Sequence, residues 1–230
     1  MGKAVAADAD PSGLSHNLAG QRLGRKGRDT RERILAATER LLAASNDAIS
    51  VSAVAREASL GMATFYQYFS DLTELLLAVL DPIMASAEQS YVGHLRERWP
   101  DAELSSHCLA FVEAYHDFWE RNTRILHLRN SFADANDARM RAHRIHVSQP
   151  LMQLLVLQMD GDPAVPRSPA AGMATVLMTG IERLVTITTD VSFSSLEIED
   201  PDAHVRNLMR AGARLLEFAI RDGRAGSARG

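Results

Sequence analysis

The side chains best placed to contact another molecule lie on one face of a short segment, residues 62–69. If this segment is a helix with 100° per residue, Phe65 and Phe69 share one side. Ala63 and Gln67 lie on the opposite side. Two aromatic rings on one side can anchor the segment to a core, which leaves the Gln67 amide available on the other. The pattern predicts a helix that is held on one face and presents a small polar surface outward.

The second group of side chains that could bind another molecule is charged. It lies between residues 21 and 33, which hold six basic and two acidic residues. After residue 80 the balance is reversed, with 16 basic and 20 acidic residues, and the whole chain has a net charge of −4. A basic run of this kind attracts polyanions such as nucleic acid. Two interpretations stay open, because such a run is either a solvated tail or an arm that contacts DNA.

The first two elements that must position these side chains are predicted to be helices. Asp29 followed by Glu32 resembles a capping box, and the apolar spacing that follows predicts a helix over residues 29–45. Ser50 is predicted to cap a second, shorter helix that ends near Ala58. Each helix carries apolar residues at intervals of three and four, so each is expected to bury one face.

A tight turn and a third helix complete this unit. Residues 59–61 form the predicted turn, and Gly61 is expected to cap the helix over residues 62–69. Two short helices that meet across a three-residue turn are typical of a helix-turn-helix. Asp71 is predicted to cap a long fourth helix, which Pro82 is expected to kink or end.

Three stretches of this region resemble the DNA-binding domain of the TetR family of transcriptional regulators. They are TRERIL from Thr30, VAREA from Val54 and TFYQYF from Thr64. The third is specific because it follows two helices at the right spacing and directly precedes a long helix. The resemblance covers residues 30–80. It implies a homodimeric regulator, a repressor by default, that binds a palindromic double-stranded DNA operator and is released by a small effector.

The resemblance also implies which residues contact DNA. Those that would face base edges in the major groove are Met62, Ala63, Thr64 and Gln67. Those that would lie near phosphates are Tyr66, Tyr68, Ser50 and Ser52. Gln67 is the best candidate for directional readout, because its amide can both donate to and accept from adenine. For the two tyrosines, packing against neighbouring side chains stays open as the alternative.

Three positions depart from the family pattern. Leu72 stands where the family usually has Lys or Arg, so one interaction with the DNA backbone is missing. Substitute charge is expected from basic residues of the leader, which are Arg25, Lys26 and Arg28. Ser59 replaces the usual glycine, which is unfavourable if the position is left-handed. Gly61 replaces the common serine, so the cap of the third helix is expected to be weak.

The rest of the chain is predicted to be helical, so the fold class is all-α: a three-helix helix-turn-helix domain followed by a larger helical domain. The expected helices cover residues 101–121, 122–133, 135–158, 168–190 and 202–221. The predicted domains are a flexible basic leader, 1–27, a DNA-binding domain, 28–75, and a ligand-binding and dimerisation domain, 76–230. The resemblance implies that two chains pair through residues 168–190 and 202–221, although their apolar stripes could instead serve the intramolecular core.

Aromatic and methionine side chains of the central helices predict a cavity for a small, largely apolar or amphipathic effector. The candidate ligand-binding residues are Phe111, Tyr115, Phe118, Trp119, His127, Arg129, Met140, His143 and Met152. An aromatic stripe at helical spacing also forms ordinary core, so that alternative stays open for each of them.

No pattern in the sequence predicts catalysis, a cofactor or a metal site. A nucleophile elbow, a phosphate loop and zinc-protease spacing are all missing. His143 and His146 lie one helical turn apart, but the sequence brings no third ligand to them. The single Cys108 is expected to be a small buried residue of a reducing compartment.

The localisation predicted from the sequence is cytoplasmic, with no membrane contact, because no apolar run reaches the roughly 20 residues of a bilayer span. The main alternative function is a helical small-molecule-binding protein or enzyme without sequence-specific DNA binding. A second alternative is a regulator that binds a protein partner, or DNA without sequence preference.

Overall fold

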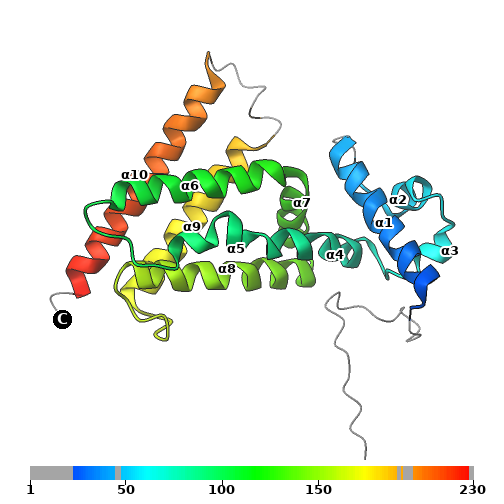
Figure 1. The fold of residues 1–230 in the computed structure, drawn as a ribbon, viewed down its shortest axis with the longest axis horizontal. Helices are drawn as coiled ribbons and strands as arrows, with labels where there is room; N and C mark the ends of the chain where they lie inside the picture. The colour runs from blue at the N-terminus through cyan, green and yellow to red at the C-terminus, as the bar shows by residue number, and fades with distance from the viewer. Residues whose placement is uncertain (1–22, 45–47, 191–192, 194–198, 228–230) are drawn as a thin grey trace, which may run out of the picture. The chain divides into compact units, whose positions relative to one another are not determined.

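The computed structural model describes residues 23–44, 48–190, 193 and 199–227. Over these residues the chain forms helices and turns and no β-strand, so the predicted all-α class is confirmed. The chain divides into two units, Met1–Val79 and Leu80–Gly230, which are described separately (Figure 1). Of the predicted leader, residues 1–22 lie outside the part that the structure describes.

The N-terminal unit is built from α1 (Arg25–Ala44), α2 (Val51–Glu57), α3 (Met62–Phe65) and the first turns of α4 (Leu72–Ala85). One hydrophobic core holds these helices together. Its buried members are Ile34, Ala37, Val54, Ala55, Ala58, Phe65, Phe69 and Leu75. Three of these members are alanines, whose small side chains let short helices approach closely around the two phenylalanine rings.

The first helix begins four residues earlier than the sequence predicts. The amides of Gly27 and Arg28 donate to the Gly24 carbonyl at 3.0 and 3.1 Å, so the helical hydrogen bonds start there. Leu23 is buried and lies against Gly27, where a Cβ would come within 2.8 Å of its side chain. The capping box at Asp29 is therefore wrong, because that residue lies inside α1.

The third helix is shorter than predicted. Its α-helical part is Met62–Phe65, and the chain continues in tighter turns. The Gln67 amide donates to the Thr64 carbonyl at 3.2 Å, and the Tyr68 amide donates to the Phe65 carbonyl at 2.9 Å, both from three residues away. Phe69 is nevertheless buried beside Phe65, with ring centroids 5.9 Å apart. Phe65 and Phe69 therefore share a buried side as predicted, although the backbone after Phe65 is not α-helical.

The larger unit contains two short helices that the sequence did not predict, α5 (Ala87–Ser90) and the 3₁₀ helix η1 (Val92–Leu95). Each is four residues long, too short to show helical periodicity. The long helices lie close to the predicted ranges: α6 (Leu104–Arg121), α7 (Thr123–Asp134), α8 (Ala138–Gln158), α9 (Pro169–Thr188) and α10 (Pro201–Ser227). Pro82 does not end α4, which continues for three more residues to Ala85.

The long helices of this unit pack as a bundle. Helix α10 packs against α6 and α9, α8 packs against α7 and α9, and α6 also contacts α9 (Figure 1). Aromatic residues of α6 fill the centre, where Phe111, Phe118 and Trp119 are almost completely buried. Tyr91, between α5 and η1, packs edge-on against Phe118 with a centroid separation of 5.0 Å. The short segment that joins α4 to α6 thus contributes to the core.

Candidate nucleic-acid interface and ligand cavity

The start of α2 is fixed by a serine cap, as predicted. The Ser50 hydroxyl accepts a hydrogen bond from the Ala53 amide at 3.2 Å, and its backbone is extended. The hydroxyls of Ser50 and Ser52 lie 3.1 Å apart and share a hydrogen bond. Ser52 is exposed and Ser50 half-buried, so both hydroxyls lie near the surface at the positive end of a short helix.

The turn between α2 and α3 contains a left-handed residue, Ser59, which is the condition under which the sequence predicted an unfavourable conformation there. Ser59 has φ 54°, and the Leu60 amide donates to the Ala55 carbonyl at 2.8 Å, which ends α2. A side chain in this conformation is strained, because its Cβ approaches the following carbonyl. Gly61 caps α3 with extended backbone and no side-chain hydrogen bond, so the expected weakness of this cap is confirmed.

The outward face of α3 presents the residues predicted to face DNA bases. Met62 is 41% exposed, and Ala63 and Gln67 are exposed as well. Thr64 is half-buried on the flank. Phe65 is completely buried beneath them. The structure therefore separates an anchoring side from an open side, as the spacing of these residues predicted.

The two tyrosines of this segment differ in their surroundings. Tyr66 is 48% exposed and forms a T-shaped pair with Phe65, with ring centroids 5.5 Å apart. Tyr68 is half-buried and packs against the N-terminal core. The phenol of Tyr66 is thus the more accessible of the two, and Tyr68 has a packing role in addition to any interaction with phosphate.

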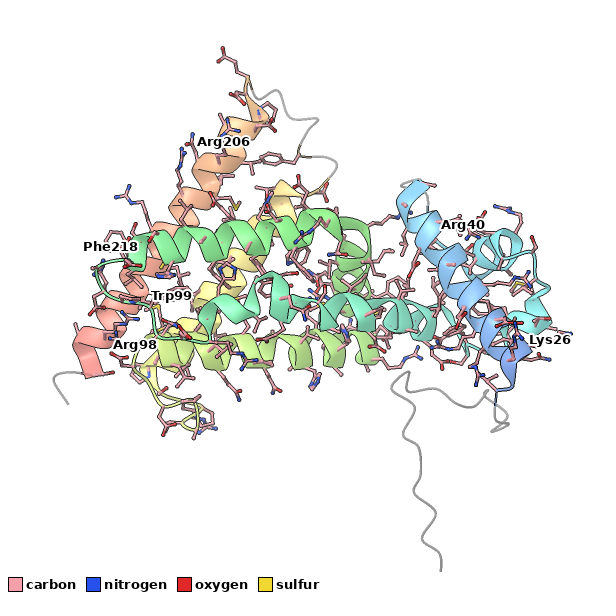
Figure 2. All side chains as sticks on the ribbon, viewed as in Figure 1. Lys26, Arg40, Arg98, Trp99, Arg206 and Phe218 are labelled. Atoms are coloured by element: carbon pink, nitrogen blue, oxygen red, sulfur yellow. The ribbon has the colours of Figure 1, made fainter. Side chains whose placement is uncertain are left out.

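The basic residues assigned to the leader lie on a helix. Arg25, Lys26 and Arg28 are exposed side chains of the first turn of α1, where Figure 2 labels Lys26. Their positions are therefore fixed relative to α2 and α3. Other arginines of α1 are used inside the unit: Arg33 donates to the Ala58 carbonyl at 2.7 Å, and the guanidinium of Arg31 lies 5.3 Å from the centre of the Phe69 ring.

The packing of Leu72 explains why an apolar residue stands at this position. Leu72 lies at the start of α4, half-buried, and packs against the N-terminal core. The cap of this helix is Asp71, which accepts from the Glu74 amide at 2.9 Å, as predicted. Leu72 thus contributes to packing where a charged residue would extend into solvent.

A cavity of about 210 Å³ lies inside the larger unit. It is lined by side chains of α4 to α9, including Met84, Tyr91, Leu126, Leu151, Met178 and Glu182. Five of the nine predicted ligand-binding residues line it: Tyr115, Phe118, Trp119, Arg129 and Met152. The sequence therefore pointed to three of the helices that line this cavity, α6, α7 and α8, and to five of its sixteen described lining residues.

Four predicted ligand residues do not line this cavity. Phe111 and Met140 are completely buried in the core, so they form the ordinary packing that was the alternative for them. His127 points toward the end of α9, where its Nε2 lies 3.1 Å from the Thr189 hydroxyl. His143 has a buried Nδ1 for which the described residues offer no hydrogen-bond partner.

Tyr91 and Glu182 are two of the cavity residues that the sequence did not predict. Tyr91 lies between two helices too short to be recognised from periodicity. Glu182 had a usable signal, since it is the one carboxylate of α9, a mostly apolar helix in which Arg183 is the other charged residue. A charge in such a position is expected to have a buried partner.

That partner is Arg129 of α7, which is 4% exposed. Its Nη2 donates to Glu182 Oε1 at 3.2 Å, and the Asn130 amide donates to the same oxygen at 3.1 Å. The guanidinium also donates to Asn130 Oδ1 and lies 5.5 Å from the centre of the Trp119 ring. A buried cation thus lines an otherwise largely apolar cavity.

Burial controls the protonation of the groups around this site. It raises the pKa of Tyr91 to about 12 and raises the pKa of Tyr115 further, so both phenols are neutral hydrogen-bond donors at neutral pH. Burial lowers the pKa of His143, and the neighbouring Arg129 lowers it in the same direction. The neutral imidazole of His143 therefore adds no charge beside the cavity at neutral pH.

Two other features bear on metal and membrane binding. His116, Asp117 and Glu120 of α6 bring possible metal-ligand atoms within 4.8 Å of one another, and two of these residues are exposed. Helix α9 is long and apolar enough to span a membrane by composition alone, which the sequence analysis had not expected. Only 28% of its most apolar window is buried in the structure. By itself this is weak support for a membrane span, because apolar helices also occur in soluble proteins.

Comparison with known proteins finds a family to which the N-terminal region is similar. Residues 34–79 match the family described as bacterial regulatory proteins, tetR family. A solved structure of a TetR family transcription regulator from Marinobacter aquaeolei VT8 is similar to the chain, with a TM-score of 0.51 and 18% identity. The similarity covers 84% of this chain and 98% of that chain, and at this identity it establishes the fold alone. Among curated proteins none matches the chain.

Proposed function

We propose that this chain, a transcription regulator whose N-terminal domain belongs to the tetR family of bacterial regulatory proteins, is a dimeric repressor. It binds a palindromic DNA operator through residues 28–75 and is released by a small effector bound within residues 76–230. The observation that carries this proposal is the outward face of α3, where exposed Ala63 and Gln67 lie above the buried Phe65. Phosphate contacts from α1 and α2 would set the register, and the α3 side chains would read base edges.

Pairing through α9 and α10 is supported by apolar side chains left at the surface of a single chain. Val176 of α9 is 67% exposed, and Phe218 of α10 is 64% exposed, labelled in Figure 2. Met173, Ile187 and Leu215 are exposed on the same two helices. Isolated exposed apolar residues are ordinary, but a set on two adjoining helices is typical of an interface. A two-fold dimer would present two copies of α3 to successive major grooves, which lie roughly 34 Å apart.

Effector release is proposed to act through α4. This helix contributes Leu75 to the N-terminal core and Met84 to the wall of the cavity. A ligand that prefers one position of Met84 would therefore bias the position of α4. In the position that the effector favours, the distance between the two α3 helices would no longer match the spacing of the two half-sites. Effector binding would then lower the affinity for the operator, and operator binding would lower the affinity for the effector by the same factor.

The same proposal places the protein in the cytoplasm, without catalytic activity, cofactor or metal. The exposed apolar residues of α9 are assigned to the dimer interface, so the apolar composition of this helix serves pairing and not a membrane. An intact soluble dimer purified without detergent is the expected state.

A gel-shift titration tests the DNA-binding part of this proposal. The probe is the DNA upstream of the gene, compared with a version in which each palindrome is scrambled. The proposal predicts tight binding to the first probe alone, whereas a small-molecule carrier or an enzyme would bind neither and an architectural protein would bind both equally.

Two variants that each introduce a negative charge test the assignment of DNA reading to α3. Ala63→Glu places a carboxylate on the exposed face and should abolish binding by repelling phosphates. Ala142→Glu makes the same change at an exposed position of α8 and serves as the control. Equal binding by both variants would reject α3 as the DNA-reading element.

A further inference from the structure

The cavity of about 210 Å³ holds one buried charged group whose hydrogen-bonding capacity is not used up, the guanidinium of Arg129. A guanidinium has five N–H donors. Its Nε and Nη2 donate to Asn130 and Glu182, and for Nη1 no acceptor is found among the described residues. This donor is therefore available to an acceptor that a ligand supplies, and a charge-assisted hydrogen bond to it would favour binding.

The charges that line the cavity favour an anion over a cation. Arg129 and Arg144 both line it, and Glu182 is the one carboxylate among the described lining residues. Glu182 already accepts two hydrogen bonds on Oε1, and 28% of its side chain is exposed, so water can hydrate its other oxygen. Arg144 is paired with Asp134, whose side chain is 70% exposed and does not line the cavity. The lining therefore carries a net positive charge.

The remaining lining is mostly apolar and aromatic, with the hydroxyls of Ser148, Thr175 and Thr179 among it. Tyr91, Tyr115, Phe118 and Trp119 are joined by methionine and leucine side chains. Tyr91 meets Tyr115 and Phe118 edge-on, at centroid distances of 4.8 and 5.0 Å, so the rings form walls with different orientations. Such walls suit a flat apolar group. The volume is below the roughly 300–1,000 Å³ of sites for drug-sized ligands, which indicates a small molecule.

We propose that the effector is a small aryl monocarboxylate, whose carboxylate accepts from Arg129 Nη1 with Arg144 nearby and whose ring lies among the tyrosines and Trp119. This inference rests on the proposed function, because it names the chemical class that would release the repressor. Met84 and Met152, which also line the cavity, would pack against the aryl ring of the effector. The Arg129–Glu182 ion pair would stay in place.

The test is calorimetric titration of the purified full-length protein without DNA. The probes are benzoate, phenylacetate and 3-phenylpropionate, each beside the primary amide and the amine of the same skeleton. At least one carboxylate is expected to bind at least about tenfold more tightly than its amide and its amine, the ratio that one charge-assisted hydrogen bond provides. Tighter binding of an amine would make Glu182 the recognising group and overturn the proposal. Equal binding within each set, or no binding of any carboxylate, would also overturn it.

Variants locate the site. The double variant Arg129→Gln/Glu182→Gln removes both charges of this ion pair together, so neither charge is left without its partner. This variant should lose the preference for the carboxylate while still binding the amide, which shows that the cavity remains intact. If the double variant does not fold, Arg144→Ala provides the second test, with Arg141→Ala, an exposed arginine of the same helix that does not line the cavity, as the control. Carboxylate binding should weaken in the first and not in the second, and equal affinities would reject the site.

The same carboxylate added to a gel shift separates this inference from the proposed function. Binding to the protein without release of DNA would leave the site assignment standing and contradict the repressor switch. DNA binding with no carboxylate bound in calorimetry would contradict the site and leave the DNA-binding proposal standing.

Discussion

Gln67 is the side chain of the α3 face with the greatest capacity to distinguish bases. Its amide is exposed and can donate and accept at once, whereas Met62 and Ala63 offer only apolar surface. Gln67→Ala is therefore expected to lose about 1 to 3 kcal/mol of preference at one operator position, with little change at the others. Gel shifts on operators changed one base pair at a time would measure this. Uniform weakening over all operators would show that Gln67 contacts only the backbone.

Arg25 and Arg28 are expected to act through charge alone. They are exposed on the first turn of α1 and can neutralise phosphates without reading bases. Arg25→Ala/Arg28→Ala should weaken binding to every DNA sequence similarly. The slope of log affinity against log salt should become shallower by about 0.9 for each phosphate that is no longer neutralised.

Arg40→Ala is the matched control for this pair. Arg40 is also an exposed arginine of α1, but it forms an ion pair with Glu57 at 2.8 Å. Its removal should leave the salt dependence unchanged. A salt dependence unaltered in the double variant as well would mean that the start of α1 does not contact DNA.

Among the elements, the turn between α2 and α3 is the one in which sequence and conformation disagree. Ser59 adopts φ 54°, a conformation that costs a residue with a Cβ about 1 to 2 kcal/mol and costs glycine much less. Ser59→Gly should therefore raise the free energy of unfolding by about 1 kcal/mol, measured by urea denaturation. Ser52→Gly, inside α2, should lower it by about 0.5 to 1 kcal/mol. The same sign for both would show that Ser59 is not strained.

Arg224, in the C-terminal part of α10, forms hydrogen bonds with the end of α8. Arg224 is buried and donates to the Gln158 backbone carbonyl at 2.8 Å, to its side-chain oxygen and to Asp101. Gln158 is buried as well and donates to the carbonyls of Leu95 and Glu97. Three segments distant in sequence are thus joined by one polar network.

Removing this arginine should leave the Gln158 backbone carbonyl without its donor, whereas Gln158 Oε1 still accepts from the Trp99 amide. Arg224→Met is expected to lower the free energy of unfolding by about 1 to 3 kcal/mol in urea denaturation at a fixed protein concentration. The control is Arg221→Met. Arg221 is more exposed and pairs with Glu217 one turn away, so its removal should cost about 0.5 kcal/mol or less. Similar losses of stability in both variants would contradict the role of the network.

How far the sequence predicted each element depended on how local its determinants are. The Ser50 cap and the burial of Phe65 follow from neighbours within one turn, and both were predicted correctly. The start of α1 depends on Leu23 lying against Gly27, an interaction that a capping pattern does not show. In the cavity, Arg129 and Glu182 are 53 positions apart, so their pairing depends on how α7 and α9 are placed, and periodicity within one helix carries no such information.

At the scale of the whole molecule, the proposed operator binding requires two copies of α3, so it should depend on the proposed dimer interface. Val176 and Phe218 are the most exposed large apolar residues of α9 and α10. Val176→Glu/Phe218→Glu places two carboxylates in each copy of the proposed two-fold interface. Burying unpaired charges is strongly unfavourable, so the variant should be monomeric in sedimentation experiments at concentrations where the unaltered protein is dimeric.

The monomer should retain its helices and lose operator affinity. A single helix-turn-helix contacts one half-site, so affinity should fall by several orders of magnitude while weak binding to any DNA persists. Leu157→Glu is the matched control, since Leu157 is a similarly exposed apolar residue of α8, outside the proposed interface. If the α9 and α10 variant stays dimeric, or is monomeric with full operator affinity, pairing through these two helices is not what aligns the reading helices.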